Sequence, residues 1–172
     1  MEITYENLVK WFDKYFEDVN KNQGALETIP NLKKYFTSDF EFVMYTIPPV
    51  PQASMVTRPM SREGLLMLFL HPGLHEGLVP QYYVVDLKKM IVVVQFEIRF
   101  VDRISGKEWP PMQASAHYHL VLDQNNDLKI RKIQYWIEMI ASDETMSVFD
   151  VWIERRDKAL MEHAVSYINA KS

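Results

Sequence analysis

The chain has 172 residues, 48% of them apolar and 13% aromatic, which is enough for a substantial core within one domain. The formal net charge is -4 and the basic residues are scattered, so a nucleic-acid partner is not expected. There is no cysteine, which excludes disulfides, thiolate nucleophiles and zinc sites built on sulfur.

The first six residues are acidic and polar, whereas a signal peptide would begin with basic and then apolar residues. No apolar run reaches the length that a helix needs to span a bilayer. We therefore expect a cytoplasmic protein that makes no contact with a membrane.

The first predicted element is an amphipathic helix from Tyr5 to about residue 20, with Thr4 as its N-cap. Its apolar residues recur at spacings of three and four and share one stripe. They are Tyr5, Leu8, Phe12, Tyr15 and Val19. A short helix is expected after Pro30, with Asn31 as its cap.

A strand is predicted over residues 40–45, where apolar side chains alternate. The proline-rich segment 47–51 cannot be an interior strand, because proline lacks the donor that a ladder needs, so it is expected to form the lip of a pocket. Ser61 is expected to cap a second helix, which ends at His71-Pro72-Gly73.

From about residue 77 the pattern turns to strands. Segments 79–86 and 90–102 predict a hairpin, and further strands are predicted over 112–122 and 128–139, separated by turn-forming residues 123–127. A last helix is predicted from Ser142 or Asp143. Its apolar stripe must dock on the sheet or on a partner, and comprises Phe149, Trp152, Ile153, Leu160, Ala164 and Tyr167.

The order of helices first and strands afterwards favours an α+β fold with helices on one face of an antiparallel sheet. We expect one domain over residues 1–172, with its core at about 5–140 and the C-terminal helix at about 143–169.

Three segments resemble the nuclear transport factor 2-like superfamily, which includes SnoaL-like polyketide cyclases, ketosteroid isomerase and scytalone dehydratase. They are Tyr35-Phe36-Thr37-Ser38-Asp39, Ser61-Arg62-Glu63 with Leu65, Leu66 and Phe69, and Lys129-Ile130 with Tyr135-Trp136. The resemblance implies a cone-shaped, curved antiparallel sheet (a cystatin-like roll) backed by the N-terminal helices. It also implies a cavity for a small hydrophobic molecule and a homodimer.

The resemblance also assigns positions to known catalytic groups. The aspartate base of ketosteroid isomerase falls near Val43, and its helix tyrosine falls near Phe12, with Tyr15 one turn later. One histidine of scytalone dehydratase corresponds to His117, while the position of its partner carries Tyr82. Neither position aligned with ketosteroid isomerase therefore carries its catalytic residue, and half of the scytalone dehydratase constellation is missing or rebuilt.

Two neighbouring strands predict a polar ladder. Within 90–102 the apolar residues share one face, and Gln95, Glu97 and Arg99 share the other. Within 112–122 the polar face holds Gln113, Ser115, His117 and His119. If the connection is symmetric about Gly106 and Lys107, Glu97 lies opposite His117.

A carboxylate opposite an imidazole suits acid–base catalysis, with His117 as the proton shuttle and Glu97 raising its pKa and orienting it. Alternatively, this face is solvated or contacts a second subunit, while the apolar face lines the core. His117, His119 and Glu97 are also a possible ligand set for a metal, although no further motif accompanies them, and we expect neither metal nor cofactor.

Tyrosines are the other candidates, because a buried phenol can donate to a carbonyl as it becomes an enolate. The candidates for this role are Tyr15, Tyr45 and Tyr82, and the expected pocket wall comprises Tyr15, Phe12, Met44, Met67, Tyr135 and Trp136. The first hypothesis is a cofactor-free dehydratase, isomerase or cyclase that acts on a hydrophobic carbonyl or hydroxy compound. The second is a non-catalytic ligand-binding or dimerisation domain.

Overall fold

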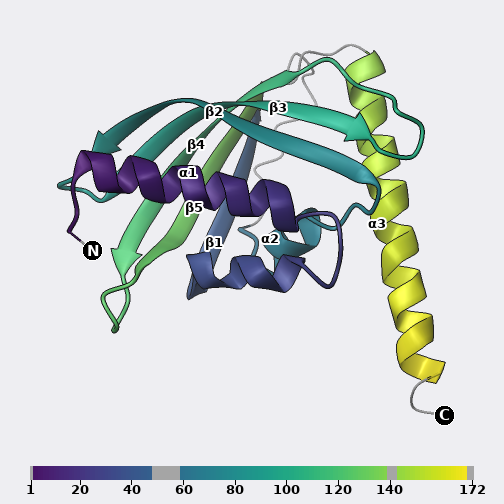
Figure 1. Ribbon diagram of the computed structural model, residues 1–172, viewed down its shortest axis with the longest axis horizontal. Helices are drawn as coiled ribbons and strands as arrows, with labels where there is room; N and C mark the ends of the chain where they lie inside the picture. Colours follow the sequence, from purple (N-terminus) through teal and green to yellow (C-terminus); the bar gives the residue numbers. More distant parts are fainter. Residues whose placement is uncertain (1, 48–58, 139–142, 170–172) are drawn as a thin grey trace.

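The computed structural model describes residues 2–47, 59–138 and 143–169, and shows a curved five-stranded sheet with helices on one face (Figure 1). The strands lie in the order β1-β5-β4-β3-β2. They are β1 (Phe36–Ile47), β2 (Leu74–Asp86), β3 (Ile91–Asp102), β4 (Met112–Leu122) and β5 (Leu128–Glu138). The α+β class and the C-terminal helix are confirmed, although β1 pairs with β5 in parallel. The predicted lip at 48–51 lies outside the described residues.

Helix α1 (Tyr5–Asn22) lies across the sheet (Figure 1). The predicted cap is confirmed, because the Thr4 side chain accepts a hydrogen bond from the Asn7 N–H at 3.2 Å. The buried face includes Phe12 and also Phe16, whereas Tyr5 is 48% exposed and does not belong to it. The Phe12 ring packs edge-on against Tyr118 of β4, with 4.9 Å between their centroids.

The predicted second helix is a 3-10 helix, η1 (Ile29–Tyr35), which begins after Thr28 and not at Asn31. A buried carboxylate ties it to α1. Asp18 accepts hydrogen bonds from Lys34 Nζ at 2.7 Å and from Tyr35 Oη at 2.6 Å. Because both donors belong to η1, Asp18 fixes the packing of the two helices.

Helix α2 (Arg62–Leu68) carries the predicted cap, since Ser61 Oγ accepts from the Gly64 N–H at 3.2 Å. The chain then turns directly into β2, which begins at Leu74, earlier than expected. Gly73 makes this early start possible with a φ of +81°, a conformation that side chains rarely adopt. Pro80 lies within β2 at a register shift, and β2 is an edge strand, where proline is tolerated.

The predicted hairpin of β2 and β3 is confirmed, as is the split between the apolar and polar faces of β3 and β4. The predicted register between β3 and β4 is wrong, because Glu97 pairs with Gln113, and His117 pairs with Val93. The turn closes earlier than expected, because the Asp102 carbonyl accepts from the Gly106 N–H at 2.7 Å.

Helix α1 also covers the outer edge of β2. The Asn20 side chain donates to the Leu78 carbonyl at 2.9 Å and accepts from the Leu78 N–H at 2.8 Å, and Gln23 donates to the Glu76 carbonyl. These side chains form hydrogen bonds with backbone groups of β2 that could otherwise pair with another strand. They also fix the part of β2 that carries Glu76.

Helix α3 (Asp143–Asn169) stands beside one end of the sheet (Figure 1). Its predicted docking is confirmed, since Trp152 Nε1 donates to the Leu68 carbonyl at 3.1 Å and Arg155 Nη2 lies 3.3 Å from Asp102 Oδ2. Ile153 and Leu160 of the expected stripe are exposed, and the side chains of residues 164 and 167 lie outside the described set. Among the helices of the described ranges, none is long and apolar enough to cross a membrane.

Candidate functional site

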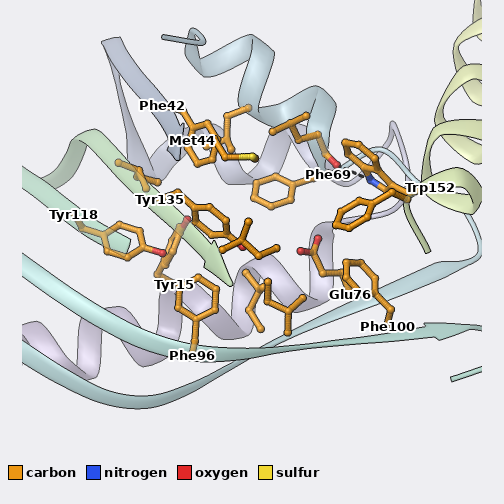
Figure 2. Close-up of a pocket in the computed structure, with 17 residues that line it drawn as sticks. Tyr15, Phe42, Met44, Phe69, Glu76, Phe96, Phe100, Tyr118, Tyr135 and Trp152 are labelled. Atoms are coloured by element: carbon orange, nitrogen blue, oxygen red, sulfur yellow. Dashed lines mark hydrogen bonds between the residues drawn. The ribbon is translucent and has the colours of Figure 1, made fainter. Parts of the chain in front are cut away.

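A cavity of about 330 Å³ lies between the helix-covered face of the sheet, α1, α2 and α3 (Figure 2). Its wall consists mainly of phenylalanine, leucine and isoleucine side chains. The polar groups of the lining, among the described residues, belong to Tyr15, Glu76, Tyr118, Tyr135 and Trp152. The cavity is therefore an apolar chamber with a few polar groups, which is typical of small-molecule sites.

Glu76 is the only charged side chain in the described part of the lining. It lies near the start of β2, where Leu74, Glu76 and Leu78 alternate toward the interior, and its side chain is 17% exposed. Figure 2 shows its carboxylate pointing into the cavity, toward the side on which the tyrosine rings lie. A carboxylate in such surroundings is a candidate proton acceptor.

His71 lies directly behind this carboxylate. Its side chain is fully buried, and its Nε2 lies 3.6 Å from Glu76 Oε2. Its other ring nitrogen, Nδ1, lies 2.8 Å from the Leu74 carbonyl oxygen. Since a carbonyl only accepts, Nδ1 carries a proton and donates it.

Sequence reasoning missed the pair of His71 and Glu76. Pro72 and Gly73 were expected to end the preceding helix, which in the structure already ends at Leu68, and this expectation gave no reason to link His71 to Glu76. The available signal was Glu76 itself, a lone acidic residue on an otherwise apolar face between Leu74 and Leu78.

Three tyrosine hydroxyls accompany the carboxylate. Burial raises the pKa of Tyr15, Tyr118 and Tyr135 above the usual value, and the negative charge of Glu76 adds to this for Tyr15 and Tyr135. All three therefore stay protonated at neutral pH. The Tyr15 and Tyr118 side chains interact through a hydrogen bond, in which one phenol donates and the other keeps its own proton for a ligand.

The structure brings part of the expected pocket wall together. Tyr15, Met44 and Tyr135 line the cavity. Phe12 lies behind it in the core, with 0% exposure, and Met67 is 37% exposed on α2. The expected catalytic group lies elsewhere.

Of that group, His117 and Glu97 lie on the opposite face of the sheet, as their alternation with Tyr118 and Phe96 requires. Glu97 forms an ion pair with Arg99 and does not face His117. Burial, followed by the nearby His119, lowers the pKa of His117, whereas pairing with a carboxylate was expected to raise it.

The remaining candidates also lie away from the cavity. The ring of Tyr45 stacks on Trp136 with 5.0 Å between the ring centroids. The Trp136 ring also packs against the His117 ring, with 4.6 Å between their centroids. Tyr82 is 56% exposed. His119 bonds to Gln134, and in the described ranges no three metal-ligating side chains gather.

A scan of the sequence against protein-family models and a search of curated proteins found no match. Solved structures do match. ActVI-ORFA from Streptomyces coelicolor is 12% identical, with a TM-score of 0.55, over 77% of this chain and 96% of its own. Nuclear transport factor 2 from Cryptosporidium parvum is 12% identical, with a TM-score of 0.55, over 76% of this chain and 90% of its own.

A third structure, a nuclear transport factor 2-like protein of unknown function from Burkholderia pseudomallei, is 8% identical, with a TM-score of 0.52. The match covers 84% of this chain and 95% of that protein. At such low identity these likenesses concern the fold and not the activity. Together with the curved sheet and its covering helices, they show that the chain has the nuclear transport factor 2-like fold.

Proposed function

We propose that the protein binds a small hydrophobic molecule in this cavity and moves a proton on it without a cofactor. Glu76 would act as the general base, and the substrate would be a carbonyl or hydroxy compound. The observation that carries the proposal is a single carboxylate aimed into an apolar cavity beside protonated tyrosine hydroxyls.

The chemistry follows from the charges. Glu76 takes a proton from the carbon next to a carbonyl, and negative charge moves onto the carbonyl oxygen. Tyr15 donates a hydrogen bond to that oxygen and so stabilises the enolate. The interaction is strong because the apolar walls of the cavity keep away the water that would screen it. Glu76 then gives the proton back. Its return to another carbon gives an isomer, its transfer to a departing β-hydroxyl releases water and leaves a dehydrated product, and its transfer to the alkoxide that forms when the enolate attacks a second carbonyl completes a ring closure.

The walls favour flat, ring-containing substrates. Phe42, Phe69, Phe96 and Phe100 offer aromatic surface, and Trp152 closes the side next to α3. Aromatic side chains pack well against conjugated rings. The volume of about 330 Å³ is at the lower end for small-molecule sites, so the substrate is expected to be compact.

The test measures proton abstraction directly, so it does not require the physiological substrate. A panel of hydrophobic ketones and enones is incubated with the protein in D2O, and NMR follows the loss of the α-protons. Glu76→Gln is expected to slow this exchange by a factor of about 100 or more. Glu41→Gln is the matched control, because Glu41 is exposed on β1 of the same sheet.

His117→Ala distinguishes the sequence-based hypothesis from the present one. If Glu76 is the base, exchange continues in His117→Ala. Wild-type rates in Glu76→Gln, or loss of exchange in a folded His117→Ala protein, would contradict the proposal.

A second candidate is a non-catalytic binding domain that forms a homodimer. It is favoured by the side chains that alternate away from the cavity, including Glu97, His117 and Trp136, which offer polar and aromatic groups to a second subunit. Here Glu97→Ala and His117→Ala would change association, as measured by sedimentation velocity, while ligand affinity stays the same. Wild-type protein would then show no α-proton exchange.

A further inference from the structure

His71 is unusual because a polar ring atom is buried without a partner. The side chain is completely buried, and Nε2 makes no hydrogen bond in the described residues. Leaving such a group unpaired away from water costs on the order of 1–3 kcal/mol. The nearest acidic group, Glu76 Oε2, lies at 3.6 Å, which is too far for a hydrogen bond but within the range of an ion pair.

The hydrogen bond at the other side of the ring restricts the protonation states. Nδ1 donates to the Leu74 carbonyl, so a neutral His71 has a lone pair at Nε2. That lone pair would face an ionised oxygen of Glu76 with no proton between them. One additional proton, on either Nε2 or Oε2, converts this repulsion into an attraction.

The other charged and titratable groups around the pair do not supply this proton. His75 of β2 contacts Arg103, with 3.1 Å between His75 Nδ1 and Arg103 Nη2. Arg155 of α3 approaches the turn, but its Nη1 lies 3.4 Å from the Pro72 carbonyl and its Nη2 pairs with Asp102.

The hydroxyls of Tyr15 from α1 and Tyr135 from β5 lie on the cavity side of Glu76. They belong to the lining, whereas His71 does not. His71 therefore approaches Glu76 from behind the cavity wall.

We propose that His71 and Glu76 hold one proton between them, and that His71 is thereby the residue that positions Glu76 as a base. The inference deepens the proposed function and rests on it for its catalytic consequence. In the form that acts as a base the shared proton lies on Nε2 and faces Oε2, so Glu76 remains a carboxylate and Oε1 is the oxygen left for a substrate. The shared proton also neutralises the pair, which lowers the cost of keeping a carboxylate in an apolar chamber.

The first experiment counts the protons and needs neither substrate nor a His71 variant. NMR of protein labelled with 15N in histidine and 13C in glutamate reports the protonation of both ring nitrogens and of the Glu76 carboxyl at pH 7. One proton on Nε2 or on Glu76, in addition to that on Nδ1, is the expected result. Glu76→Gln is expected to leave His71 protonated at Nδ1 alone.

Two variants separate positioning from a structural role in the turn. His71→Asn keeps a donor near the Leu74 carbonyl and removes the group that faces Glu76, whereas His71→Gln places an amide nitrogen near the position of Nε2. Positioning predicts that His71→Asn lowers the rate of α-proton exchange about tenfold or more and shifts its pH profile. His71→Gln is expected to recover part of the rate.

The outcomes distinguish the two proposals. A pair that holds one proton in a protein without α-proton exchange supports the shared proton and contradicts only the proposed reaction. An ionised Glu76 beside a His71 protonated at Nδ1 alone overturns the inference, whatever the activity. So does a His71→Asn protein with the wild-type rate and pH profile.

Discussion

The contact between Asn20 and Leu78 offers a sharp test of how α1 holds the edge of the sheet. Asn20 donates to the Leu78 carbonyl at 2.9 Å and accepts from its N–H at 2.8 Å. In the variant Asn20→Ala both backbone groups of Leu78 lose their partner. Leu78 is only 8% exposed, so water replaces these bonds poorly.

The magnitude follows from two lost hydrogen bonds. At roughly 0.5–1.5 kcal/mol each, Asn20→Ala should lower the free energy of unfolding by about 1–3 kcal/mol. Asn20→Asp keeps the acceptor but turns an oxygen toward the Leu78 carbonyl, so it should cost about 1 kcal/mol or more. Asn31→Ala is the matched control, because Asn31 is exposed and donates a single side-chain bond, to Asn22. It should cost about 0.5–1.5 kcal/mol, half the cost of Asn20→Ala, because it removes one hydrogen bond and not two.

Urea unfolding of the three variants and the wild type, followed by circular dichroism, measures these differences. Ligand affinity is the second readout, since Leu78 and Glu76 both line the cavity. An Asn20→Ala protein whose free energy of unfolding lies within about 0.5 kcal/mol of the wild-type value would contradict the role of Asn20. So would an Asn31→Ala protein that loses as much free energy of unfolding as Asn20→Ala.

Two further variants test the packing of the helices. Burial alone would raise the pKa of Asp18, but hydrogen bonds from Lys34 and Tyr35 lower it below its usual value. The resulting stability is present above the unfolded pKa of about 4 and lost as pH falls below it, so wild-type protein should lose more stability than Asp18→Asn between pH 7 and pH 3 in urea unfolding. Gly73→Ala places a Cβ 2.7 Å from Arg155 Nη1 at a φ of +81°. It should cost about 1–3 kcal/mol, and an unchanged melting curve would contradict this.

Much of the architecture was predictable because it depends on local patterns. Thr4 and Ser61 are capping residues, and each accepts the hydrogen bond that a cap is expected to accept. The two faces of β3 were also predictable, because alternation alone decides them. The β3–β4 register depends instead on where the turn closes, and the Asp102 side chain closes it early by accepting from the Ile104 N–H and the Ser105 hydroxyl.

Of the candidate site, too, only the part that follows from local sequence patterns was predictable. Tyr15, Met44 and Tyr135 were expected at the pocket because an apolar pattern directs them to the interior. The meeting of His71 and Glu76 depends on a reversal at a glycine and on a bond across the turn. Neither produces a periodic pattern, so the sequence displays the two residues without linking them.

The position of Glu76 on an edge strand links stability to the proposed chemistry. An edge strand has a neighbour on one side only, so its terminal residues are free to move unless other elements hold them. Glu76 is held by Gln23 at its carbonyl, by Asn20 through Leu78, and by His71 at its carboxylate. A base must keep its oxygen within hydrogen-bond reach of the proton that it abstracts. Asn20→Ala should therefore slow α-proton exchange even under conditions in which the variant is fully folded, and a fully folded Asn20→Ala protein with the wild-type rate would show that His71 and Gln23 suffice to hold Glu76.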